Sequence, residues 1–184
     1  MKRGIVSASA FLLAVGLAAS PEAVAQLPFG LSASDVEAGF IMAVMDGCAN
    51  AAETGRTLDQ LNPYRIIRDT NRGAARAPKP GYTAWAPGMG VGIVEINDGP
   101  GGCDVVAFGA SVVSTFHAVS GALIARGYVA EPAGASEVGS VRHDLTRIVG
   151  GRTVRVVLAG GEAGSASGSS QFSQLSASVT ITSS

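Results

Sequence analysis

The sequence has few of the residues from which recognisable enzyme sites are usually built. It contains two cysteines and two histidines, and charged residues make up only 15% of its 184 positions. The histidines, His117 and His143, form neither an H-x-x-x-H nor an H-E-x-x-H pattern, so the sequence predicts no zinc site. C-x-x-C is also missing, which argues against a thioredoxin-like redox role. We therefore expect no metal and no cofactor.

Complete phosphate-binding motifs are missing too, although the chain contains 25 glycines. Gly88 and Gly90 begin a G-x-G pattern, but Ile93 occupies the position of the last glycine in G-x-G-x-x-G. The glycines at 160–164 are not followed by the Lys-Ser/Thr pair of a P-loop. A formal charge of −1 gives no general attraction to nucleic acid or anionic lipid. We therefore expect no nucleic-acid partner.

The chain does have enough apolar residues for a folded core. Hydrophobic residues make up 47% of it, whereas disordered chains combine few apolar residues with many charges. A chain the size of residues 26–184 buries about 70% of its unfolded surface on folding. We predict a single globular domain over 26–184.

The N-terminus has the pattern of a secretory signal peptide. Two basic residues follow Met1, the run 10–19 is apolar but too short to span a bilayer, and residues 23–25 read Ala-Val-Ala. This pattern predicts cleavage between Ala25 and Gln26, which makes 1–25 a signal peptide; the alternative is an uncleaved anchor helix. No later stretch is apolar for long enough to span a membrane. We expect a periplasmic or secreted protein.

The two cysteines, Cys48 and Cys103, both lie in the predicted mature chain. An oxidising compartment favours disulfides, so the simplest hypothesis is that they pair; the alternative is two buried thiols. Closing a loop of about 56 residues would stabilise the fold by about 4 kcal/mol in the chain-entropy model.

Helical periodicity predicts two main helices, at 32–54 and 111–126, and a helical turn at 57–61. In the first, Ser34 is the expected N-cap because Glu37 follows at capping-box spacing. Glycine directly after each helix predicts its end.

Five strands are predicted, at 91–96, 103–108, 141–149, 152–159 and 175–182. The first two are expected to form a hairpin with a six-residue loop. The third and fourth are expected to form a hairpin with a two-residue turn at Gly150-Gly151. The segment 62–87, which contains four prolines, predicts a long irregular connection. Together the patterns predict an α+β fold: an antiparallel β-sheet of about five strands with two helices packed on one face.

A cluster of basic and aromatic residues within that connection is the most unusual local feature. Its members are Arg65, Arg68, Arg72, Arg76, Tyr64, Tyr82 and Trp85. Arginine beside aromatic residues is enriched at interfaces, so the cluster predicts a site for an acidic protein or envelope partner. The alternative is a solvated loop.

A hydrolase site around His143 is a second hypothesis. Asp144 adjoins it, but neighbouring strand residues point to opposite faces, so Asp144 would not easily orient His143. No G-x-S-x-G motif is present. A two-residue turn at 150–151 would place His143 opposite Leu158, while a longer loop would change its face.

The favoured function is therefore non-catalytic binding of a protein or envelope partner, of which a secreted inhibitor would be one example. A hydrolase using His143 and a small-ligand carrier are the alternatives. A hydrolase should show a histidine beside Asp, Glu or Ser in a cleft. A carrier should show a cavity with a few inward polar groups.

Overall fold

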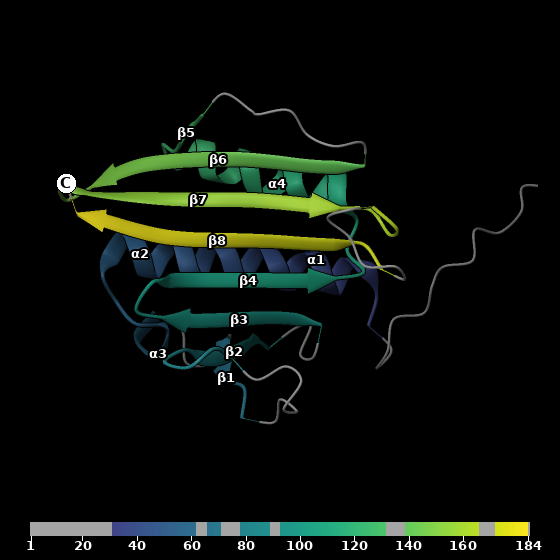
Figure 1. Cartoon of the computed structure of the whole chain (residues 1–184), viewed down its shortest axis with the longest axis horizontal. Helices are drawn as coiled ribbons and strands as arrows, with labels where there is room; N and C mark the ends of the chain where they lie inside the picture. The colour runs from purple at the N-terminus through teal and green to yellow at the C-terminus, as the bar shows by residue number, and fades with distance from the viewer. Residues whose placement is uncertain are drawn as a thin grey trace, which may run out of the picture.

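The computed structural model describes residues 31–61, 66–70, 78–88, 93–131, 139–165 and 172–183. Within them the chain is α+β, with helices on one face of a single antiparallel sheet (Figure 1). The predicted signal peptide, 1–25, lies outside the described residues. Among the helices of these ranges, none is long and apolar enough to cross a membrane.

The described part of the sheet has eight strands, and not about five as predicted. They are β1 (Ile66–Arg68), β2 (Thr83–Pro87), β3 (Val94–Gly99), β4 (Gly102–Phe108), β5 (Val129–Ala130), β6 (Ser140–Val149), β7 (Arg152–Gly161) and β8 (Gln174–Ser183). Their order in the sheet is β1-β2-β3-β4-β8-β7-β6-β5, and every neighbouring pair is antiparallel. Two four-stranded meanders therefore meet where β4 pairs with β8.

The three strands that sequence patterns missed are β1, β2 and β5. β5 has two residues and β1 has three, which is too short for alternation to show. β2 lies in the segment 62–87 that predicted an irregular connection, and its last residue is Pro87. Pairing with β3 makes β2 a strand, so tertiary contacts override its weak local pattern.

The first helix covers the predicted range as three consecutive segments. They are α1 (Ala33–Met42), the π-helix η2 (Ala43–Ala49) and α2 (Asn50–Thr54). The N-cap is Ser32 and not Ser34: its hydroxyl accepts a hydrogen bond from the backbone of Asp35, whose carboxylate accepts one from the backbone of Ser32. Both serines had an acid three residues later, so spacing alone could not decide between them.

Two further helices are present in the described residues, so there are three and not two. The helical turn predicted at 57–61 is α3 (Leu58–Leu61), and α4 (Val112–Ala125) is the predicted second helix. Gly55 and Gly127 end the two long helices with φ of 72° and 90°, as their sequence positions predicted.

The two predicted hairpins differ in outcome. Gly150-Gly151 forms the expected two-residue turn, with Val149 paired to Arg152. The β3–β4 hairpin also has a two-residue turn and not a six-residue loop, because Gly99 pairs with Gly102. Asn97 and Asp98 have turn chemistry, but they pair with Asp104 and Cys103 in the ladder.

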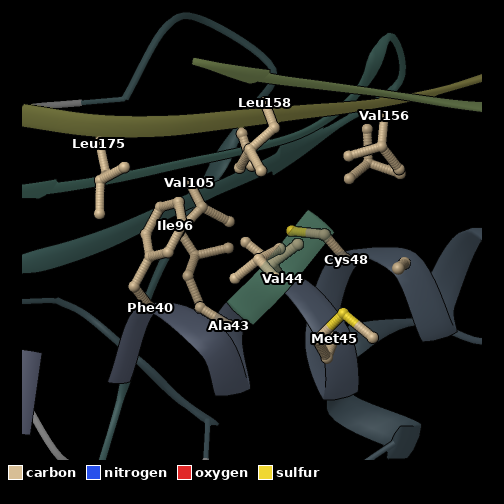
Figure 2. Close-up of a cluster of buried hydrophobic side chains, with 14 of the residues drawn as sticks. Phe40, Ala43, Val44, Met45, Cys48, Ile96, Val105, Val156, Leu158 and Leu175 are labelled. Atoms are coloured by element: carbon tan, nitrogen blue, oxygen red, sulfur yellow. The ribbon is translucent and has the colours of Figure 1, made fainter. Parts of the chain in front are cut away.

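The core lies between the sheet and the helices. Figure 2 shows Phe40 and Val44 on the first helix pointing toward Val105, Leu158 and Leu175 of the sheet; all five are fully buried. The predicted Cys48–Cys103 disulfide is confirmed and joins η2 to β4. Such a bond fits an extracellular or periplasmic protein, because the cytosol keeps thiols reduced.

The turn between β3 and β4 depends on Gly102. Its φ is +132°, and a Cβ there would lie 2.3 Å from the Val179 carbonyl oxygen of β8. We expect Gly102→Ala to lower the free energy of unfolding by about 2 kcal/mol, because the backbone must shift or strain.

Gly121 in α4 is the matched control, since a Cβ there meets no atom within 4 Å. Gly121→Ala should raise stability by about 0.5–1 kcal/mol through helix propensity. Urea titration of both variants measures these effects; equal stability of the two would contradict the assignment.

Candidate functional site

A pocket with a volume of about 310 Å³ lies at the end of the sheet where helix α2 ends and the β3–β4 hairpin turns. Its walls come from three places: the end of the first helix with the residues after it, the hairpin, and the adjoining ends of β7 and β8. The Cys48–Cys103 disulfide forms part of the wall, so the covalent link between helix and sheet also frames this site.

Two arginines bring positive charge to the pocket. Gly55 turns the chain after α2 in the left-handed conformation, and the next residue, Arg56, lines the pocket and is exposed. Arg152 enters from the start of β7, and its guanidinium donates a 3.3 Å hydrogen bond to the Glu53 carbonyl oxygen. A cation is favourable there because the carbonyl end of a helix carries partial negative charge.

The hairpin side of the pocket is shaped by Tyr82. Its ring lies directly against the turn, so a Cβ on Gly99 would come within 2.6 Å of the ring. A Cβ on Gly101 would come within 2.9 Å of the Tyr82 hydroxyl oxygen. Tyr82, which the sequence placed in a binding cluster, therefore supports the wall of the pocket from outside.

Asp98 is the acid of the pocket. Burial raises the pKa of its carboxyl above the ordinary 3.8, and repulsion from the Asp59 carboxylate raises it further. The Asp59 carboxylate lies 3.4 Å from the Arg68 guanidinium. Arg68 therefore pairs with Asp59 and not with Asp98. Within the described part of the chain, the Asp98 carboxylate has no hydrogen-bond donor or ion-pair partner, and the Arg56 guanidinium has no acceptor.

Charges next to the pocket are, in contrast, fully engaged. The Glu53 carboxylate accepts a 2.9 Å hydrogen bond from the Tyr128 hydroxyl and lies 3.2 Å from the Arg147 guanidinium. Burial, followed by the bond to Glu53, raises the pKa of Tyr128. Arg126 donates a 2.7 Å hydrogen bond to the Met45 carbonyl oxygen. Its guanidinium also lies 3.6 Å from the Asp46 carboxylate. The bonds of Glu53 join the ends of both long helices to β6, and each of these charges has a partner.

Three members of the predicted basic and aromatic cluster are described. The guanidinium of Arg68 lies 5.2 Å from the ring centroid of Trp85, which is only 4% exposed and faces the helices beside Ile96. The third, Tyr82, is half-buried. The remaining members, Tyr64, Arg65, Arg72 and Arg76, lie outside the described residues, so the cluster as a whole stays a prediction.

His143 lies on the core side of β6, paired with Leu158, as the two-residue turn implied. Its Nδ1 is 2.9 Å from the Ser120 hydroxyl on α4, and its ring is 5.0 Å from that of Phe116. Ser120 is only 3% exposed, and neither partner lines the pocket. Asp144 lies on the opposite face, where it pairs with Arg142 and Arg155.

His117 is exposed on α4 and contacts the edge of Phe116. In the described ranges, no group of three His, Cys, Asp or Glu side chains is arranged to hold a metal ion.

The residues that sequence reasoning missed are Arg56, Asp98 and Arg152. Arg56 and Arg152 directly follow glycine turns that the sequence indicated, at Gly55 and at Gly150-Gly151, whereas Asp98 lay inside the six-residue loop that was wrongly predicted. The turns were readable, but their convergence at one end of the sheet depends on strand order. A search for charges beside helix and hairpin ends would have found them.

Comparison with protein-family models, with curated proteins and with solved structures finds no match for this chain.

We expect Asp98→Asn to raise the melting temperature at pH 7. Because the folded-state pKa is raised, the ionised carboxylate costs more in the folded protein than in the unfolded chain. The wild type therefore becomes less stable than the variant as the pH rises through the folded-state pKa of Asp98. The difference between the proteins should vanish below pH 3.8, where Asp98 is protonated in both states. Thermal unfolding from pH 3 to pH 8 measures it, and an unstabilised variant at pH 7 would contradict this environment.

Ser120→Ala should lower the free energy of unfolding by about 1–2 kcal/mol, because the His143 Nδ1 then loses its partner inside the protein. Ser114→Ala is the control on the same helix, since Ser114 is exposed and its hydroxyl donates only an exposed hydrogen bond, to the Ser111 hydroxyl. Urea unfolding of both variants isolates the Ser120–His143 bond from helix propensity. Equal stabilities would show that the bond contributes nothing.

Proposed function

We propose that the mature chain is an exported, non-catalytic binding domain whose small ligand occupies the pocket at the end of the sheet. The observation that carries this proposal is the pairing of an unpartnered acid, Asp98, with an unpartnered base, Arg56, in one concave site. Half-burying a carboxylate without a partner costs stability, so its presence in a pocket points to a ligand that completes it.

Catalysis by His143 has less support. A nucleophilic hydroxyl must reach the substrate, whereas Ser120 is covered by the packing of α4 on β6. The bond between Ser120 and His143 satisfies two polar groups inside the protein, which is sufficient to explain both residues.

Partner binding by the arginine cluster is a second candidate. The side chain of Arg68 is 59% exposed, yet the Trp85 ring and Asp59 hold it in place. A cation that is both exposed and pre-positioned loses little conformational entropy when it meets an acidic partner. Asp59 also repels the Asp98 carboxylate, so the charges around Arg68 influence the acid of the pocket.

The pocket is tested by native mass spectrometry. Protein secreted by a bacterial host is incubated with a bacterial small-molecule extract, gel-filtered and measured before and after denaturation. We expect the wild type to retain a small molecule. The double variant Arg56→Gln/Asp98→Asn should retain it at an occupancy at least about tenfold lower.

Arg142→Gln/Asp104→Asn is the control pair. It removes the same charges from the other face of the sheet, so it should retain the molecule as the wild type does. Equal retention by both double variants, or no retention by the wild type, would refute binding in this pocket.

A further inference from the structure

The pocket also indicates the chemical class of its ligand, an inference that rests on the proposed function. We infer that the ligand is a small zwitterion of the amino-acid or dipeptide type. Its carboxylate binds the Arg56 guanidinium, and its ammonium binds the Asp98 carboxylate.

The positive side of the pocket is suited to a carboxylate. Arg152 spends a donor on the Glu53 carbonyl oxygen, while Arg56 keeps all of its side-chain donors available. A guanidinium presents paired N–H groups that match the two oxygens of a carboxylate. Arg56 is therefore the anchor, and Arg152 adds positive charge behind it.

The negative side is suited to an ammonium group. The Asp98 carboxylate can accept several hydrogen bonds and receives none from the described residues. A neutral hydroxyl would satisfy one of its oxygens but would leave the half-buried charge uncompensated. An ammonium group supplies both donors and the opposite charge.

The two charged groups do not neutralise each other. No ion pair joins Arg56 to Asp98, although both line the same pocket. Arg56 follows α2 and Asp98 lies on β3, and the disulfide fixes that helix to the neighbouring strand β4. Arg56 and Asp98 thus line the pocket from two separate elements of this frame.

The size and walls of the pocket agree with such a ligand. Its volume of about 310 Å³ lies at the lower end for ligand sites. Ala51, Ala52 and Ile181 line it with apolar surface, which suits a short aliphatic side chain. A net excess of one positive charge, from two arginines and one aspartate, disfavours simple cations.

The test uses isothermal titration calorimetry with glycine, alanine, leucine and alanyl-alanine, each compared with its C-terminal amide and its N-acetyl form. We expect at least one zwitterion to bind about tenfold more tightly than both of its singly charged forms. Arg56→Gln should abolish the preference over the amide and keep the preference over the N-acetyl form. Asp98→Asn should do the reverse, and Arg142→Gln and Asp104→Asn should change neither.

Other outcomes separate this inference from the proposed function. If an amide or N-acetyl form binds as tightly as its zwitterion, and Arg56→Gln/Asp98→Asn abolishes that binding, the pocket binds ligands but the zwitterion assignment is wrong. The assignment is also wrong if no probe binds while the extract supplies a pocket-dependent molecule of another class. If no probe binds and the extract supplies nothing, both proposals fail.

Discussion

The disulfide between Cys48 and Cys103 is the covalent link between the helix layer and the sheet. It joins the π-helical part of the first helix to β4, the strand at which the first meander meets the second. The bond joins residues 55 positions apart, so it lowers the conformational entropy of the unfolded chain. In the folded protein it fixes the first helix to the sheet. The same bond forms part of the pocket wall, so it contributes both to the stability of the fold and to the shape of the candidate site.

Charge is distributed unevenly at that end of the molecule. Glu53, Tyr128 and Arg147 form a network that ties the helix ends to the sheet, and Arg126 bonds separately to the first helix. Asp98 and Arg56 lie nearby without partners among the described residues. Proteins retain such local costs where function requires them, because selection acts on stability only down to a threshold. The contrast between engaged and unengaged charges separates the candidate site from the structural network around it.

The fold could be predicted where a pattern is local. Helices at 33–54 and 112–125, their glycine ends and the Gly150-Gly151 turn were all readable because each depends on neighbours in the chain. β1, β2 and β5 were not readable, since short strands are defined by the strands beside them. The β3–β4 turn was predicted too long for the same reason: strand pairing overrides the turn preference of Asn97 and Asp98.

Local patterns were sufficient to predict an antiparallel sheet with helices and to predict that Cys48 pairs with Cys103. The same patterns predicted that Asp144 would not easily orient His143, since adjacent strand residues point to opposite faces. The contact of His143 with Ser120, and the meeting of Arg56, Asp98 and Arg152 at one pocket, follow from the packing of the elements. These contacts join residues far apart in the chain, and their proximity depends on strand order, which no local spacing encodes.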